Sequence, residues 1–436
     1  MALLIEGADL DGRLIDILVE GTRIASVEPA SRQPSDRVRP GREAFGPGSR
    51  DREAAEVFDA RGLAVMPSLV NAHAHSAMTL LRGLGEGLPL ERWLGEAIWP
   101  REARMDAEDI YWGTRLAAIE MISSGTSICH DMYLDPLASA RAARDSGMRF
   151  VVNYALIDGM DEGKAAAQRK ACEEFFDHLP DFGPLVSFNL AAHSVYATTA
   201  SSLRWLGAFS RDRGLSLHIH LAETEFESRS CREAHGMSPA FYLDSLGVLS
   251  PRLFAAHGLW LDEADFDLLA ERGVRLVHNP ASNMKLASGP AYDYAAARSR
   301  GIATLLGTDG AASNNGLDLF ADMKLAGLLQ KHHFRDSTRL GVAELLAAAG
   351  TRGHEAFGDG AGRLEAGASA DFILVDLKAP GMVPRHDLGA NLVYAGGGGA
   401  VHSLVCAGSF LMRNRKIEGA EEVRLRAEER AKRLAG

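Results

Sequence analysis

Short apolar runs alternate with longer segments of helical pattern through the middle of the chain, and each run is followed by enough sequence for a helix. Eight strands alternating with helices predict a closed, parallel (β/α)8 barrel. An open, doubly wound sheet is the alternative, and periodicity alone does not separate the two. No glycine-rich phosphate-binding motif follows the first run, which favours the barrel. The eight runs are Ser68–Val70, Thr126–His130, Phe150–Ile157, Val186–Ala191, Leu215–Leu221, Leu253–Ala256, Val274–Val277 and Ile302–Leu306.

Both ends of the chain show short strands separated by turns. Neither end can bury its own apolar face, so we expect a small β-sandwich assembled from the two. The expected domains are residues 1–66 and 365–436 in the sandwich, the latter with a terminal helix, and residues 67–364 in the barrel. The segment Gln33–Glu56, rich in Pro, Gly, Arg and Asp, is interpreted as an exposed loop. The predicted strands are Ala2–Glu6, Leu14–Val19, Thr22–Val27, Val57–Asp59, Leu63–Met66, Asp371–Leu377 and Ser403–Ala407.

Composition narrows the range of partners. The 58 acidic and 47 basic residues give a net charge of −11, which disfavours nucleic acid and anionic membranes. No run of 18 apolar residues predicts a transmembrane helix, and Met1–Leu10 lacks the pattern of a signal peptide. The four cysteines form no C-x-x-C pair, which excludes a cysteine zinc cluster and indicates a cytoplasmic protein. We expect a small-molecule substrate and, from general prevalence, a homo-oligomer.

Nearly every predicted barrel strand ends in a residue that can bind a metal or move a proton. His73 and His75 follow the first strand, His220 ends the fifth, His257 ends the sixth and Asp309 follows the eighth. The C-terminal ends of barrel strands meet at one mouth, so these residues should converge. Taken singly, His257 is typical of a structural histidine, and Asp309 of a loop or helix-cap residue. Their joint occurrence at strand ends indicates a site.

Two H-x-H pairs need separate treatment, because one such pair is a weak motif. In a strand, residues i and i+2 face the same side, so His73 and His75 can reach one ion. In the second pair, Glu223 lies three residues after His220, which favours His220 as the inward ligand. His218 is then interpreted as a packed, hydrogen-bonded neighbour.

Three neutral imidazoles and one carboxylate suit a divalent ion such as zinc, with a position left for water; iron, manganese and nickel are alternatives. Binding lowers the pKa of that water toward roughly 7. Asp309 can accept its proton, and Glu223 can protonate a ring nitrogen of the substrate. His257, if not a ligand, can hydrogen-bond the attacking oxygen while ammonia leaves. The stretch Val186–His193 contains no lysine to bridge two metals, which favours a single ion.

From about residue 60 onward the chain resembles the amidohydrolase superfamily. Within that superfamily it is most similar to the 5′-methylthioadenosine/S-adenosylhomocysteine deaminases. The most specific of the matching passages is the one that contains Asp309. The passages are Pro67–His75, Leu88–Leu90 with Trp93, Ile98–Glu102, His220–Thr224, Ala255–His257, His278–Asn283 and Leu306–Asn315.

The resemblance implies roles for individual residues. It implies that four residues bind the metal: His73, His75, His220 and Asp309. It implies that Glu223 and His257 act in catalysis, that Glu102 contacts the ribose hydroxyls and that His193 contacts the substrate.

The remaining predicted substrate contacts are aromatic. Trp93 and Trp99 can cover a flat ring, and packing in a lid or core is the equal alternative. Members of the group that bind the homocysteine carboxylate are expected to carry an arginine at the end of the third strand. Here that region contains Tyr154 and no arginine. Lys164 and Arg169 are the candidate substitutes for the missing guanidinium. Methylthioadenosine or adenosine is therefore favoured over S-adenosylhomocysteine.

These observations predict a metal-dependent deaminase that converts an adenosine-type nucleoside to its inosine analogue and ammonia. Deaminases of guanine or oxidised purines, pterins and aminofutalosine, and hydrolases of s-triazines, share the same metal chemistry and are the alternatives. Glu102 favours a ribosyl substrate over a bare base. A barrel that has lost its metal and serves as an assembly protein would lack ligands, and none is missing here.

Overall fold

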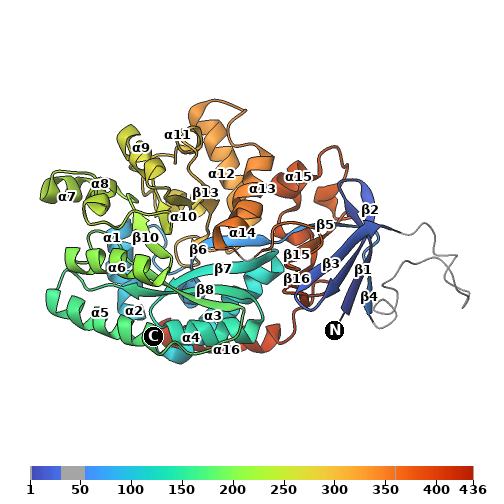
Figure 1. Cartoon of the computed structure of the whole chain (residues 1–436), viewed down its shortest axis with the longest axis horizontal. Coiled ribbons are helices and arrows are strands. Elements are labelled where there is room, and N and C mark those ends of the chain that lie inside the picture. The colour runs from blue at the N-terminus through green and yellow to red at the C-terminus, as the bar shows by residue number, and fades with distance from the viewer. Residues whose placement is uncertain (1, 31–54, 359, 436) are drawn as a thin grey trace, which may run out of the picture.

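The computed structural model describes residues 2–30, 55–358 and 360–435, and within them a nine-stranded parallel sheet forms the centre (Figure 1). Each of the eight predicted runs overlaps one of its strands, so the barrel prediction is confirmed. The last, two-residue strand pairs in parallel with the first, which excludes the open-sheet alternative. The strands are β6 (Leu69–His75), β7 (Thr126–Tyr133), β8 (Arg149–Leu156), β9 (Val186–Ala192), β10 (Leu217–Leu221), β11 (Leu253–His257), β12 (Arg275–His278), β13 (Thr304–Leu306) and β14 (Asp309–Gly310).

Helices connect these strands, and local sequence sets where many of them begin and end. The Asp135 side chain accepts hydrogen bonds from the backbone at the start of α4, and Gly147, with a φ of 69°, ends that helix in a left-handed conformation. The helices after β7 are α4 (Pro136–Ser146), α5 (Glu162–Asp177), α6 (Ala200–Arg213), α7 (Glu225–His235), α8 (Pro239–Ser245), α9 (Glu263–Glu271), α10 (Pro280–Lys285), α11 (Tyr294–Ser299), α12 (Leu319–Phe334), α13 (Val342–Ala349) and α14 (Thr351–Phe357).

The connection from β6 to β7 is longer than the others and contributes to the mouth of the barrel. It contains η2 (Ser76–Leu81), α1 (Leu90–Arg92), η3 (Trp93–Ile98), α2 (Trp99–Glu102) and α3 (Ala107–Ser123). The C-terminal helix, α16 (Ala420–Ala435), lies against α3 (Figure 1). There Arg430 Nε lies 2.6 Å from Asp109 Oδ1, and Leu434 packs in one apolar cluster with Trp93. This helix therefore braces the segment that carries both predicted tryptophans.

Strands from the two ends of the chain join in a second sheet, as predicted. Its hydrogen-bonded order is β17-β16-β15-β5-β1-β2-β3, and β4 pairs with β1. The sheet encloses its own core, with Ile5, Ile17 and Phe372 buried together. The predicted boundaries at residues 66 and 365 stay predictions, and residues 33–54 of the predicted loop lie outside the described residues. The strands are β1 (Ala2–Leu10), β2 (Arg13–Glu20), β3 (Arg23–Pro29), β4 (Glu56–Asp59), β5 (Leu63–Pro67), β15 (Phe372–Asp376), β16 (Val401–Cys406) and β17 (Ser409–Met412), the last not predicted.

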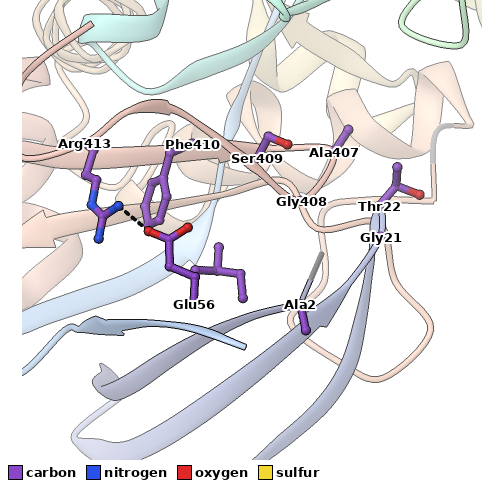
Figure 2. A pocket seen from close by; sticks show the side chains of 10 residues that line it. Ala2, Gly21, Thr22, Glu56, Ala407, Gly408, Ser409, Phe410 and Arg413 are labelled. Carbon is purple, nitrogen blue, oxygen red and sulfur yellow. Dashed lines mark hydrogen bonds and ion pairs between the residues drawn. The ribbon is translucent and has the colours of Figure 1, made fainter. Parts of the chain in front are cut away.

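A cavity of about 530 Å³ lies in this terminal sheet, where the hairpin at Gly408 meets the turn at Gly21 (Figure 2). An ion pair between Glu56 and Arg413 crosses one side of it. The cavity lies away from the histidines of the barrel and takes no part in the chemistry considered below.

Two further expectations concern the whole chain. No helix in the described part of the chain is long and apolar enough to cross a membrane. Cys129, Cys172, Cys231 and Cys406 are buried and unpaired, as the scattered spacing indicates. The homo-oligomer and the cytoplasmic location stay predictions.

Candidate metal centre

The barrel brings the first predicted ligands together by pairing its first and last strands. His73 and His75 lie on the same side of β6, and Asp309 of β14 is paired with Ala74 between them. The Nε2 atoms of His73 and His75 lie 3.4 Å and 3.2 Å from Asp309 Oδ1. Two imidazoles therefore face one carboxylate oxygen.

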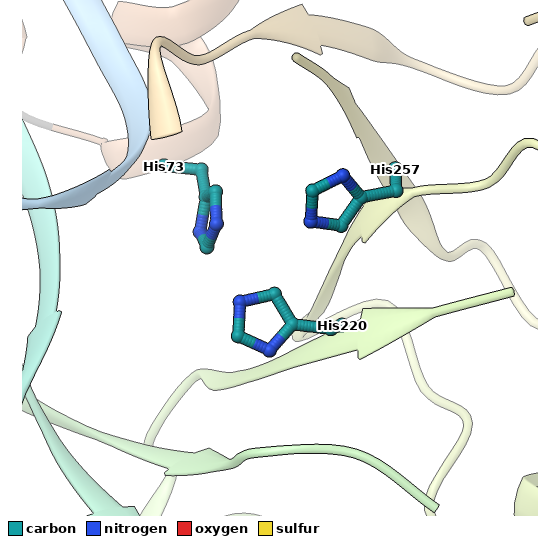
Figure 3. A group of neighbouring side chains, drawn as sticks. All are labelled: His73, His220 and His257. Atoms are coloured by element: carbon teal, nitrogen blue, oxygen red, sulfur yellow. The ribbon is translucent and has the colours of Figure 1, made fainter. Parts of the chain in front are cut away.

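The other predicted ligand comes from across the barrel. His220 Nε2 lies 3.2 Å from His75 Nε2. His73, His220 and His257 offer ring nitrogens that lie within 4.8 Å of one another (Figure 3). All four residues predicted to bind metal thus converge at the C-terminal ends of β6, β10 and the β13–β14 segment.

Hydrogen bonds at the outer ring atoms orient two of the imidazoles. His75 Nδ1 lies 2.6 Å from the carbonyl oxygen of Met132, and His220 Nδ1 lies 2.8 Å from that of His193. A carbonyl only accepts, so each Nδ1 is the donor and each Nε2 keeps a lone pair for the shared centre. From the sequence we predicted that His193 contacts the substrate, and no sequence pattern indicated that its carbonyl accepts a hydrogen bond from His220.

Hydrogen bonds hold both carboxylate oxygens of Asp309. The hydroxyl of Ser282 donates to Oδ2 at 2.6 Å, and the N–H of Gly310 donates to Oδ1 at 2.9 Å. Burial raises the pKa of Asp309, but hydrogen bonds and charge from His73 and His75 outweigh it and lower the pKa well below its usual range. The carboxylate is therefore ionised throughout the neutral range.

The donor set fits a divalent cation. His73 is fully buried; among the described residues its Nδ1 has no hydrogen-bond partner, and its Nε2 faces Asp309 Oδ1. Burial lowers its pKa to about 4, so the ring is neutral and its lone pair is free. Burial lowers the pKa of His75, but Asp309 raises it to about 9 on balance, and a cation bound beside this carboxylate would take the place of the proton on His75 Nε2. Three imidazole nitrogens and a carboxylate oxygen are typical ligands of zinc.

Glu223 and His257 lie beside this cluster and face each other. His257 Nε2 lies 3.7 Å from Glu223 Oε2, while His257 Nδ1 lies 2.8 Å from Asn283 Oδ1. Burial raises the pKa of Glu223, which favours its protonated form and suits a general acid. Because His257 Nε2 lies near both Glu223 and the other imidazoles, its two sequence interpretations, ligand or hydrogen-bonding neighbour, both fit this geometry.

A cavity of about 620 Å³ opens over the cluster. Glu102 lines it and accepts a hydrogen bond from the Tyr133 hydroxyl at 2.9 Å, and burial raises the pKa of Glu102. His193 lines it too, and burial lowers the pKa of His193 to about 4, which keeps the ring neutral. Two polar groups thus line the cavity together with residues of the histidine–aspartate cluster.

Comparison with known proteins identifies the family. The model of the amidohydrolase family matches residues 64–411. The chain belongs to the amidohydrolase family. A 5′-deoxyadenosine deaminase of Methanoregula boonei is 44% identical over 88% of this chain and 87% of its own length. A 5-methylthioadenosine/S-adenosylhomocysteine deaminase of Archaeoglobus fulgidus is 41% identical over 87% of this chain and 90% of its own length.

A solved structure with the same fold supports the assignment. The adenosine deaminase of Xanthomonas campestris, determined with bound zinc, superposes with a TM-score of 0.87 at 32% identity and covers 99% of this chain and 98% of that one. The resemblance to the amidohydrolases inferred from the motifs is therefore confirmed.

In this amidohydrolase the two predicted tryptophans differ in environment. Trp93 is 5% exposed, donates its indole N–H to the Leu84 carbonyl at 3.0 Å and reaches the cavity with one edge. Trp99 is 53% exposed and lines the cavity as well. Trp93 therefore combines both sequence alternatives, because it packs in the lid and also borders the cavity.

The structure corrects the expectation for Tyr154. Its ring packs on Phe175 of α5 at 5.1 Å, and it does not line the cavity, whereas the next residue, Ala155, does. The reason is the alternation of side chains along β8, which turns residue 154 toward the helix layer. His218 has the predicted packed role, with its ring stacked on that of His73 at 4.8 Å and its Nδ1 3.3 Å from that of His130.

Several residues around the site carried no separate signal in the sequence. Ser282 and Asn283 lie in a polar segment after β12 that the sequence marked only as part of a family motif. The fold brings Ser282 into contact with Asp309 and Asn283 into contact with His257. Asp322 on α12 is buried behind the same loop, where Asn314 and the Ala281 N–H donate to it at 3.1 Å and 3.3 Å.

The environment of Asp322 predicts a pH dependence of stability. Burial raises its pKa to about 8 from an ordinary 3.8, so the folded chain keeps a proton that the unfolded chain loses. Between these values the folded state binds more protons, and the free energy of unfolding must fall as pH rises, by at most roughly 1.4 kcal/mol per pH unit. Chemical denaturation from pH 5 to pH 8 should show a smaller fall in Asp322→Asn than in the wild type.

The exposed Asp212 offers a control, since Asp212→Asn makes the same substitution without changing a buried group. It should retain the pH slope of the wild type. Equal slopes in Asp322→Asn and the wild type would contradict the assigned protonation of Asp322.

Proposed function

We propose that this amidohydrolase is a metal-dependent hydrolytic deaminase of an adenosine-type nucleoside. It adds water across a ring C–N bond and releases ammonia and the inosine analogue. The observation that carries the proposal is the arrangement of a histidine–aspartate cluster beside Glu223 and His257 at the floor of a cavity that has Glu102 in its wall. The two relatives at 44% and 41% identity, both named as deaminases of adenosine derivatives, support it.

We assign His73, His75, His220 and Asp309 to one divalent ion, with zinc as the favoured metal. The three nitrogens and one oxygen match zinc, and the structural neighbour determined with bound zinc supports that choice over iron, manganese or nickel. When bound, the ion supplies Lewis acidity that makes water a nucleophile near pH 7.

The side chains beside the ion handle the protons of the reaction. Asp309 is ionised, so one of its oxygens can accept the proton of the attacking water while Ser282 holds the other. His257 directs Nε2 toward the reacting atoms because Asn283 holds its Nδ1. Both groups are fixed before substrate arrives, which lowers the cost of reorganisation in the transition state.

Glu223 acts on the substrate ring. Its raised pKa favours the protonated carboxyl, which donates to a ring nitrogen and makes the neighbouring carbon electrophilic. The proton accepted from water then travels to the amino group, which leaves as ammonia. The hydroxyl left on the ring carbon returns a proton to Glu223 as it becomes the carbonyl. Water and the nucleoside thus give the inosine analogue and ammonia, with no other reactant.

The walls of the cavity favour an uncharged nucleoside. Its acidic lining groups are Glu102, Glu223 and Asp309, and no lysine or arginine among the described residues lines it. We assign Glu102 to the ribose hydroxyls and the two tryptophans to the base or sugar faces. Neither substitute considered for the missing guanidinium reaches the cavity: Arg169 binds Ser201, and Lys164 is exposed on α5. A carboxylate or phosphate would enter unpaired.

The first prediction concerns substrate choice. Ammonia release is measured with 5′-deoxyadenosine, 5′-methylthioadenosine, adenosine, S-adenosylhomocysteine, adenosine 5′-phosphate, guanine, a pterin and an s-triazine. The three uncharged nucleosides should exceed the two that carry a carboxylate or a phosphate in kcat/KM by roughly tenfold or more, because those anionic groups lack a partner. Turnover of a bare base, with every 6-aminopurine nucleoside inert, would refute the proposed function.

The second prediction concerns the metal ligands. His73→Ala removes a buried imidazole from the centre, so metal content by elemental analysis should fall and kcat/KM should drop by at least roughly a hundredfold. His332→Ala changes an exposed histidine of α12 and should leave both unchanged. Full metal content and activity in His73→Ala would show that the assigned centre is wrong.

The third prediction tests the close packing behind the centre. A Cβ at Gly307 would lie 2.6 Å from Asn279 Oδ1 and 2.9 Å from the backbone nitrogen of His73. Gly307→Ala must displace one of them, so metal affinity and activity should both decrease. Gly316→Ala, whose Cβ would approach no atom closer than 3.8 Å, serves as the control. Equal metal affinity in both variants would contradict the prediction.

A further inference from the structure

Glu227 is a second buried carboxylate beside the site, and the reaction described above does not use it. It is fully buried in the first turn of α7, four residues after Glu223. Its Oε1 accepts the N–H of Ala222 and its Oε2 accepts the N–H of Glu223, each at 3.0 Å. One carboxyl group thus holds two consecutive peptide groups. Burial raises the pKa of Glu227 to about 7, and the two N–H groups oppose that shift because they favour its ionised form.

This arrangement differs from ordinary helix capping. Thr224 is the cap of α7, and its side chain accepts from the N–H of Glu227. In a capping box the glutamate at this position would bond back to the N–H of the cap residue. Here it reaches past Thr224 to the two residues before it, so its hydrogen bonds fix the loop that carries Glu223 rather than the helix end.

The held segment has a conformation that needs support. Ala222 has a φ of 49°, a left-handed conformation that L-residues other than glycine rarely adopt. From the opposite side, its carbonyl oxygen accepts the N–H groups of Leu259 and Trp260, each at 3.0 Å. The loop after His257 and the side chain of Glu227 therefore both hydrogen-bond the segment Ala222–Glu223.

A further pair of contacts holds the other end of Glu223. The Trp260 indole N–H donates to the Ser288 carbonyl at 2.9 Å, and the Ser288 hydroxyl donates to Glu223 Oε1 at 3.3 Å. The chain of contacts runs from Glu227 through Ala222, Trp260 and Ser288 back to Glu223. The backbone and the carboxyl of Glu223 are both fixed, and Oε2 is left facing His257.

We propose that Glu227 is the positioning residue for Glu223, and that its carboxylate sets the direction in which Glu223 presents its proton to the substrate ring. The inference rests on the proposed deaminase activity. A displacement of about 1 Å in a reacting group can reduce the rate by roughly a hundredfold, so loss of these two hydrogen bonds should reduce the rate of the chemical step more than the affinity for substrate.

The test is Glu227→Gln, assayed with the best nucleoside of the panel. The amide group of glutamine places a donor against one of the two N–H groups, so one hydrogen bond is lost and replaced by repulsion. We expect kcat to fall by roughly ten- to a hundredfold, with a smaller change in KM and wild-type metal content. Glu225→Gln, an exposed position two residues earlier on the same helix, should match the wild type.

A double-mutant cycle separates positioning from general damage. If Glu227 acts through Glu223, single-turnover rates should show the effect of Glu227→Gln in the wild type and lose it in the Glu223→Gln background. The same fold reduction in both backgrounds, or wild-type kcat in Glu227→Gln, overturns the inference.

A second variant covers the case in which Glu227→Gln does not fold or loses its metal. Glu227→Asp keeps both acceptor oxygens and retracts them by one methylene, and it is measured in the same cycle with the same two outcomes. Inactivity of the wild-type enzyme toward every nucleoside would instead refute the deaminase proposal, so the two failures are distinguishable.

Discussion

β14 is only two residues long, yet its parallel pairing with β6 sets Asp309 beside His73 and His75. The same pairing joins the last segment of the barrel sheet to the first strand, so closure of the barrel and assembly of the centre are one event. Asp309 has a φ of 61°, and the hydrogen bond from Ser282 holds the carboxylate at that bend.

Burial acts on the titratable groups of the site in opposite ways. It keeps His73 neutral and raises the pKa of Glu223, whereas the two imidazoles beside Asp309 keep that carboxylate ionised. The pKa values of two carboxyl groups in one cavity are thus shifted in opposite directions, downward for Asp309 and upward for Glu223, which suits one as acceptor and the other as donor of a proton. That separation is what hydrolytic deamination at neutral pH needs.

Sequence patterns were most informative where the type of residue and its place at a strand end carried the information. His220 and His257 stood at the ends of their predicted strands, and the observed β10 and β11 place them at the barrel mouth. The positioning contacts were not accessible in the same way. In the sequence, Glu227 is typical of an acidic residue in the first turn of a helix. No sequence pattern shows that its side chain accepts the N–H groups of Ala222 and Glu223.

The sequence by itself determined the alternation of eight strands with helices, the joining of the two chain ends in one sheet and the set of candidate ligands, since spacing and residue type suffice for these. The pairing of β14 with β6 decided that the parallel sheet closes. Only the tertiary structure decided which side chains face the cavity, as the outward position of Tyr154 beside the inward Ala155 shows. The physical reason is that barrel strands are covered on both faces. Their apolar residues therefore do not alternate with polar ones, and nothing along the chain marks the inward side.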